Sequence, residues 1–306
     1  MYNDDLKNRF FAENNISSVI KNDYMRLFQK SYDMESRLGL DLCQIKDKDE
    51  LNNYLALICG VKKSTNKAIL GKIKRYIRWC VENNIDNSTD AILNMEFTQE
   101  ERFSRDLVGS ADDLNRYLNT IFDKEIKKTY DNVYRCYFWM AFIGVDIKYV
   151  YDIKNEEVNI EKRQITHEGK TYEICHEAIP SIKNCATLDG FMYSHPNYTN
   201  DIYRARIQSN QLMRGIKSET KRSTFLSGLT KRLNTNSERR LSYERVLLSG
   251  IFCRLYQTEL DGFPINFDAA ATYFLTSSQN KIVIRRNITE LEQQYNVWKK
   301  VFRNDK

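Results

Sequence analysis

The residues of this 306-residue chain best suited to chemistry are basic side chains that cluster in one stretch. Between residues 214 and 245 nine Lys or Arg face three Glu, so this stretch carries an excess of positive charge equal to the net charge of the whole chain, +6. A concentrated positive field suits a polyanion, most simply a phosphate backbone, although a solvated surface is the alternative. The expected phosphate contacts are Arg214, Lys217, Lys221, Arg222, Lys231, Arg232, Arg239, Arg240 and Arg245.

A second basic group lies along a helix that we expect in the first third of the chain. Ser64 is a suitable N-cap, and the spacing of Ile69, Ile73 and Ile77 predicts one apolar face. Lysines before the cap and the free N–H groups of the first turn form a phosphate site, although an ordinary surface helix with solvated lysines explains the pattern equally well. The candidate DNA contacts are Lys62, Lys63, Ser64, Asn66, Lys67, Lys74, Arg75 and Arg78, and those for base edges are Asn66, Arg75 and Gln211.

Cysteine and histidine side chains give little indication of a metal site. Cys175, His176, Cys185 and His195 follow one another within a short stretch, but their spacing is unlike that of zinc-binding pairs. The seven cysteines are odd in number, scattered and mostly set among apolar residues, which indicates free buried thiols in a reducing compartment. We therefore expect no metal and no other cofactor.

Helices must position most of these groups. Three prolines and eleven glycines are few for 306 residues, which favours long helices over a sheet-rich fold. The spacing of Ile20, Tyr24, Leu27, Phe28 and Tyr32 predicts an amphipathic helix that stops at the glycine of "SRLG". A second helix over "KDELNNYLALICG" and the basic helix after it complete an all-helical first part.

The polar segment after this part breaks the helical pattern. We therefore predict a helical domain over 1–86, a linker over 87–109 and a second domain over 110–306. The second domain contains the nearly all-apolar helix "DNVYRCYFWMAFIG", which should be central and buried. Helices are expected again from about residue 199 to the C-terminus.

In one stretch of the second domain the spacing of apolar residues changes from the period of a helix to that of a β-strand. Val158, Ile160 and Ile165 alternate with polar residues, "HEGK" supplies a turn, and Tyr172 and Ile174 continue beyond it, which is typical of a β-hairpin. The fold class is therefore mainly α with a small β-hairpin or sheet.

This layout resembles that of the tyrosine recombinases, or phage integrases. The resemblance rests on "LNNYLALICGVKKSTNKAILGKIKRYIRWCVENN", which is similar to a SAM-like core-binding domain, and on "YFWMAFIGVDIKYVYDIKNEEVNIEKRQITHEGKTYEI" and "LSYERVLLSGIFCRLYQTELDG" in the catalytic domain. It implies a two-lobed clamp on double-stranded DNA. The family stabilises the scissile phosphate with two arginines and a His or Trp, uses a hairpin lysine as general acid, and attacks phosphorus with a tyrosine.

The chain departs from this catalytic pattern. A carboxylate replaces the first arginine after "FIGV" and would repel a phosphate, and a serine replaces the histidine. With nineteen tyrosines in the chain, spacing does not select the nucleophile. The family positions correspond to Asp146 for the first arginine, Lys170 for the hairpin lysine, Ser242 for the histidine, Arg245 for the second arginine, and Tyr273 or Tyr295 for the nucleophile.

We therefore expect a DNA-binding protein that is not an enzyme. Losing one such donor costs about 10²–10³ in rate, and the losses compound. The chain is similar to recombinase-derived master repressors of SPbeta-type prophages, which implies a transcriptional repressor that maintains lysogeny. The alternatives are an active but divergent recombinase that forms a 3′-phosphotyrosyl intermediate, an accessory factor for a partner integrase, and a protein-binding module.

The remaining expectations concern partners and location. The N-terminus is unlike a signal peptide, and no apolar run approaches the ~18 residues of a membrane span. We expect a bacterial cytoplasmic protein associated with the nucleoid and no membrane partner. The terminal helix, with Leu291, Tyr295 and Trp298 on one face, either mediates a homodimer or packs on its own domain. A small protein or peptide antagonist is a further candidate partner.

Overall fold

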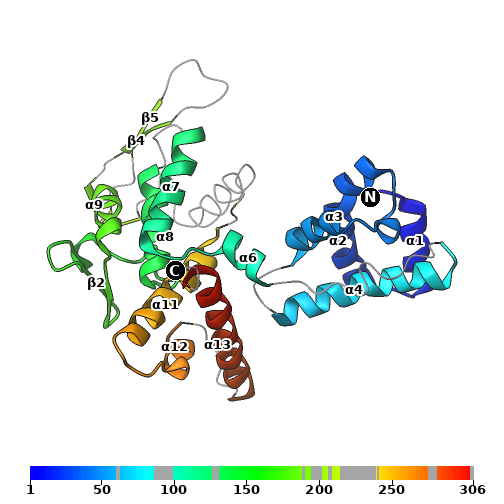
Figure 1. The fold of residues 1–306 in the computed structure, drawn as a ribbon. Coiled ribbons are helices and arrows are strands. Elements are labelled where there is room, and N and C mark those ends of the chain that lie inside the picture. Colours follow the sequence, from blue (N-terminus) through cyan, green and yellow to red (C-terminus); the bar gives the residue numbers. More distant parts are fainter. Residues whose placement is uncertain are drawn as a thin grey trace. The chain divides into compact units, whose positions relative to one another are not determined.

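The fold consists of two compact units, Met1–Phe103 and Ser104–Lys306 (Figure 1). A computed structural model describes residues 1–59, 63–85, 99–125, 131–187, 190–193, 202–205, 209–213, 239, 241–274 and 281–303. The division between the units falls within helix α6 (Gln99–Asp106). The expected boundaries at 86 and 109 stay predictions, because residues 86–98 lie outside the described part of the chain.

The first unit is helical, as expected. Gly39 ends its longest helix with φ 66°, a left-handed conformation that glycine adopts without strain. Asp47 caps a later helix, because its Oδ1 accepts hydrogen bonds from the N–H groups of Asp49 and Glu50 at 2.9 and 3.2 Å. The elements of the unit are α1 (Asp4–Glu13), α2 (Ser18–Leu38), η1 (Leu42–Gln44), α3 (Lys48–Ile58) and α4 (Lys63–Glu82).

Aromatic side chains form the centre of this unit. Phe10 of α1, Phe28 of α2 and Tyr76 of α4 are fully buried. The ring of Tyr76 lies 5.2 Å from Phe10 and 4.8 Å from Phe28, centroid to centroid, and both pairs meet edge to face. This is a favourable aromatic geometry, so the three helices are held together by one cluster.

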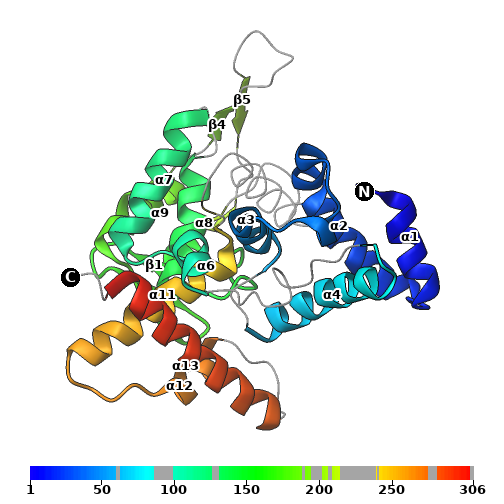
Figure 2. The same cartoon turned by 45° about the vertical axis from the view of Figure 1, so that its right-hand side comes forward.

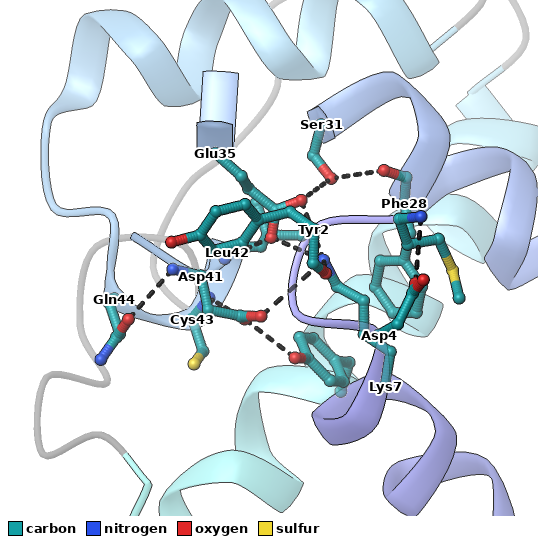
Figure 3. A network of polar contacts seen from close by, with 12 residues as sticks. Tyr2, Asp4, Lys7, Phe28, Ser31, Glu35, Asp41, Leu42, Cys43 and Gln44 are labelled. Carbon is teal, nitrogen blue, oxygen red and sulfur yellow. Dashed lines mark hydrogen bonds and ion pairs between the residues drawn. The ribbon is translucent and has the colours of Figure 1, made fainter. Parts of the chain in front are cut away.

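A buried polar network supplements this apolar core (Figure 3). Lys7 of α1 donates to both carboxylate oxygens of Glu35 at 2.7 and 2.9 Å, and its Nζ lies 3.7 Å from Asp41 Oδ2. Ser31 also donates to Glu35, at 2.7 Å. All three charged side chains are at most 1% exposed, and such buried charges persist only where they are paired and hydrogen bonded. The network therefore fixes the relative positions of α1, α2 and η1.

The second unit is mainly helical as well. Every residue from Cys136 to Val145 is buried, so α8 is the central helix that its sequence predicts. Figure 2 shows α13 beside α11 and α12, both of which it contacts. Within the described part of the chain no helix has the length and apolarity needed to cross a membrane. The helices that follow α6 are α7 (Ala111–Glu125), α8 (Asp131–Ile143), α9 (Ile179–Thr187), α11 (Tyr243–Leu260), α12 (Phe267–Phe274) and α13 (Lys281–Arg303), with the short η2 (Asn155–Glu157) and η3 (His176–Ala178).

The predicted hairpin is confirmed and gains a third strand. Strands β1 (Val158–Asn159), β2 (Gln164–His167) and β3 (Lys170–Glu173) form an antiparallel sheet in the order β1-β2-β3. Glu168 and Gly169 form its two-residue turn with φ 46° and 74°. Two successive positive φ values match the right-handed twist of a tight hairpin.

A second, two-stranded sheet corrects the expectation that only helices follow residue 199. Strand β4 (Gly190–Tyr193) pairs antiparallel with β5 (Ile202–Ala205). The apolar residues of these strands are consecutive and do not alternate with polar ones, as in Phe191–Tyr193 and in Ile202 followed by Tyr203, so the sequence pattern did not reveal the pair.

Candidate nucleic-acid interface

The exposed side of α4 carries a line of basic residues. Lys67, Lys74 and Arg78 are spaced by seven and four residues, which places them on one face of a helix with 3.6 residues per turn. Lys67 and Arg78 are exposed and Lys74 is half-buried. Within the described part of the chain none of the three forms an ion pair or a hydrogen bond, so their charge is available to a ligand. We call these three residues the α4 basic stripe.

The opposite face of α4 explains why the stripe points outward. Ile73, Tyr76 and Ile77 are at most 2% exposed. The hydroxyl of Tyr76 donates to Asp41 Oδ1 at 2.8 Å and so ties α4 to the buried network of Figure 3. Because Tyr76 is nine residues from Lys67, it lies on the other side of the helix, and fixing it fixes the rotation of the stripe.

Neighbouring basic residues of α4 are engaged within the unit. Lys72 forms an ion pair with Asp23 at 2.5 Å, and Arg75 donates to Asn14 Oδ1 at 3.3 Å. Arg75 is exposed, so it stays a candidate contact.

Asn66 is 4% exposed, so its amide is largely covered in this structure, and its expected contact with a base edge stays a prediction. Lys62 lies outside the described residues, as do the side chains of Lys63 and Ser64. Because α4 begins at Lys63, Ser64 is the second residue of the helix and not its N-cap, which corrects that expectation. The predicted phosphate site at the start of the helix stays a prediction.

In the second unit, the structure brings together two segments that the resemblance assigns to a catalytic site. The hydroxyl of the buried Tyr243, at the start of α11, donates to the carbonyl oxygen of Val145 at 2.8 Å. Arg254 donates to the carbonyl oxygen of Phe142 at 2.7 Å. A Cβ at Gly250 would lie 1.9 Å from that same oxygen, so only glycine allows α11 to approach α8 this closely. Asp146 and the start of α11 are thus neighbours.

The two substituted positions have local structural functions. Asp146 Oδ1 accepts the N–H of Lys148 at 3.0 Å and stabilises the turn after α8. Ser242 is the N-cap of α11, and its Oγ accepts the N–H of Arg245 at 3.3 Å. Neither side chain supplies a positive charge.

The arginines of the 214–245 cluster that the structure describes are paired with carboxylates. Arg245 Nη2 lies 3.3 Å from Oδ2 of the buried Asp106, and Arg239 Nη1 lies 3.0 Å from both oxygens of Asp113. These pairings compensate the charges that we expected to face a phosphate backbone. The other members lie outside the described residues: Arg214, Lys217, Lys221, Arg222, Lys231, Arg232 and Arg240.

The Tyr295 hydroxyl is engaged inside its own unit, and its assignment as a candidate nucleophile stays a prediction. It is 1% exposed, and its hydroxyl donates to Glu259 Oε2 at 2.6 Å. Burial, with the neighbouring Glu259 carboxylate, raises the pKa of Tyr295 above its usual value, which disfavours a phenolate further.

Tyr273 belongs to α12, but its side chain lies outside the described residues. Lys170 opens β3, pairs with His167 across the hairpin, and is half-buried.

The C-terminal helix buries its predicted apolar face in its own unit. Leu291, Tyr295 and Trp298 are at most 1% exposed. The indole of Trp298 donates to the carbonyl oxygen of Val108 at 3.0 Å, and Arg303 donates to that of Gly109 at 2.6 Å. This face is therefore occupied, and a homodimer through α13 would need another surface.

The candidate metal ligands are not gathered by the described part of the structure. The Cys185 thiol donates to the carbonyl oxygen of Leu212 at 3.4 Å, and His195 lies outside the described residues. No group of three His, Cys, Asp or Glu side chains suited to a metal occurs among the residues described.

The residues that sequence reasoning missed are the partners of the arginines. Asp106 and Asp113 decide what Arg245 and Arg239 contact, yet each lies more than a hundred residues away in the chain. Asp113 was visible only as an acidic residue in the first turn of a helix, and no sequence signal pointed to Asp106.

Comparison with known proteins connects the first unit to a described family. Residues 1–83 match the family described as "MrpR, N-terminal core-binding domain". No curated protein sequence matches the chain. Among solved structures, the chain is similar to the Tn1549 transposon integrase in complex with a circular intermediate DNA, with 11% identity, TM-score 0.35, and coverage of 94% of this chain and 93% of that one. It is also similar to the integrase from mycobacterium phage Brujita, with 12% identity, TM-score 0.36, and coverage of 94% and 92%.

Proposed function

We propose that the chain is a non-catalytic, sequence-specific double-stranded DNA-binding protein that acts as a prophage transcriptional repressor and maintains lysogeny. The observation that carries the proposal is the α4 basic stripe, three cations that pair with no residue in the described ranges and lie on the outer face of a unit whose residues match a core-binding domain. Cations held at one helical spacing match the regular negative charge of a duplex.

The substituted positions of the second unit support the absence of catalysis. Asp146 and Ser242 stabilise local backbone, and Arg245 is paired with Asp106. Without two arginines and a histidine near the phosphorus, the charge of the transition state has no clamp. A protein that binds a defined DNA site without cutting it regulates access to that site, which favours a repressor.

The alternative function is that of an active but divergent recombinase, and one observation supports it. Lys170 and Arg245 retain the residue types of the family pattern, and Tyr273 lies on a helix beside α13. An accessory factor for a partner integrase is the second alternative. Genome-wide mapping of bound sites separates it from a repressor, because a repressor occupies promoters and an accessory factor occupies one attachment site.

Duplex affinity measured against salt concentration tests the DNA-binding surface. A preferred duplex is first selected from a random-sequence pool with the full chain. The variant Lys67→Gln/Lys74→Gln/Arg78→Gln should then bind it more weakly, and the slope of log K against log salt should become shallower by up to about 2.7, since each lost phosphate contact removes about 0.9.

The matched control changes the same charge elsewhere in the same unit. Arg26, Lys46 and Lys48 are exposed, and the triple variant Arg26→Gln/Lys46→Gln/Lys48→Gln removes two lysines and one arginine as the first one does. We expect its slope to stay near that of the unmodified chain. Equal losses in both triple variants would show that net charge, and not the α4 basic stripe, governs binding.

A further inference from the structure

Gly71 lies in the interior of α4 although nothing within the fold requires a glycine there. It is exposed, and apart from its chain neighbours and the adjacent backbone of α4, a Cβ built on it would meet no described atom within 4 Å. Its φ is not positive, so the backbone imposes no need for glycine. In a helix interior glycine lowers the ratio of folded to unfolded protein roughly fivefold relative to alanine. Gly71 therefore lowers the stability of the first unit, and no contact within the described structure compensates for this loss.

The position of Gly71 places this bare backbone within the α4 basic stripe. It follows Lys67 by four residues, and precedes Lys74 by three and Arg78 by seven, so all four lie on one helical face. The stripe thus consists of cations on either side of Gly71, a single position at which no side chain projects from the helix. Glycine is the residue that allows such a close approach of backbone to a ligand.

We propose that Gly71 is the point where α4 makes its closest approach to the sugar–phosphate backbone of duplex DNA. This inference rests on the proposed function, because it takes duplex DNA as the partner. Lys67 lies before the contact point and Lys74 and Arg78 after it, each reaching a phosphate oxygen. Charge-assisted hydrogen bonds of this kind span about 2.7–2.9 Å, so a side chain between helix and duplex lengthens several of them at once.

Substitution of Gly71 separates this inference from effects on folding. Gly71→Ala adds one methyl group to open space and improves helix propensity, so the melting temperature should rise by about 3–6 °C. Duplex affinity should nevertheless fall, by about threefold to tenfold for Gly71→Ala and by more for Gly71→Leu, which keeps high helix propensity but adds bulk. Stability and affinity thus change in opposite directions, which a role in folding does not produce.

Ala12→Leu supplies the matched control for added apolar bulk. Ala12 is exposed on α1 of the same unit, so this variant should leave duplex affinity unchanged. Each measurement uses the full chain and the selected duplex, with the variant Lys67→Gln/Lys74→Gln/Arg78→Gln beside it.

The outcomes distinguish this inference from the proposed function. If the charge variant loses affinity while Gly71→Ala and Gly71→Leu retain it, the close approach is wrong and DNA binding stands. If Gly71→Ala lowers the melting temperature, the glycine serves the fold and the inference is overturned. If neither the charge variant nor the glycine variants change affinity, the α4 surface is not the interface, and both proposals fail.

Discussion

Arg245 lies 3.3 Å from the buried carboxylate of Asp106, and this pairing determines what the arginine contributes. The Asp106 side chain is fully buried, and Arg105 Nε lies 3.7 Å from its other oxygen. Asp106 also ends α6, at the entry to the second unit. An arginine that binds phosphate in the family pattern therefore holds the entering chain against α11.

Removal of Arg245 alone should destabilise the protein more than it weakens DNA binding. Arg245→Ala removes the guanidinium that lies 3.3 Å from the buried Asp106 carboxylate, so we expect a loss of about 3 kcal/mol in the free energy of unfolding, measured with urea. The double variant Asp106→Asn/Arg245→Met should recover much of this loss, because the buried carboxylate and the guanidinium that faces it are removed together. If Arg245→Ala folds as stably as the unmodified chain but loses duplex affinity, the arginine contacts phosphate instead.

At the scale of whole elements, α13 is held to α11 by a polar cluster at Glu259. Lys299 Nζ lies 2.6 Å from Glu259 Oε1, and the Tyr295 hydroxyl lies 2.6 Å from Oε2. The hydrogen bond from Lys299, followed by that from Tyr295, holds the pKa of Glu259 below its usual value. A carboxylate with a lowered pKa in the folded state stabilises the fold above its unfolded pKa, and this stabilisation is lost as pH falls through the folded value.

Glu259→Gln should therefore weaken the docking of α13 in a pH-dependent way. At pH 7 we expect a loss of up to about 1 kcal/mol in the free energy of unfolding, a small value because Glu259 is partly exposed to solvent. Below the usual pKa of a glutamate, the difference between the variant and the unmodified chain should shrink toward zero. A difference that stays constant from pH 7 to pH 3 would show that shape, and not charge, accounts for the effect.

Sequence patterns predicted elements well where burial is local and periodic. The sequence of α8 is apolar on all sides, and apolar and polar residues alternate on both sides of Gly169. Both patterns correspond to the observed structure, because each indicates directly which sides of an element are buried. The predicted apolar face of α2 was partly wrong: Ile20 and Tyr32 are 42% and 47% exposed, while the polar Glu35 is fully buried. Glu35 is buried because Lys7 neutralises it, and such a partner is invisible to a single-helix pattern.

The candidate site was less predictable, for the same physical reason. The α4 basic stripe follows from helical spacing alone, and the structure places it as expected. The roles of Arg239, Arg245 and Tyr295 depend on Asp113, Asp106 and Glu259, which lie far away in the chain. Charge along a sequence therefore overestimates the charge available to a ligand wherever folding supplies distant carboxylates.

At the scale of the whole molecule, the proposal joins two units that each contribute basic residues. The α4 basic stripe belongs to the first unit and the 214–245 cluster to the second. Two weak contacts linked in one chain bind more tightly than either alone, because the second becomes intramolecular. Under the proposed function, affinity for a duplex depends on both units, whereas catalysis depends on the complete set of groups at one phosphate.

This difference predicts that the full chain binds its selected duplex but never becomes attached to it. Strand cleavage by a tyrosine needs the phosphate charge clamped first, and Asp146 and Ser242 stand where the family has the first arginine and the histidine of that clamp, so we expect no detectable chemistry. Incubation with a nicked form of the selected duplex, followed by a denaturing gel, should show no protein–DNA adduct, and Tyr273→Phe should bind as the unmodified chain does. Tyr295→Phe serves as the buried control. An adduct that forms with the unmodified chain and disappears with Tyr273→Phe would instead establish the divergent recombinase, with Lys170 and Arg245 as the first residues to test for its chemistry.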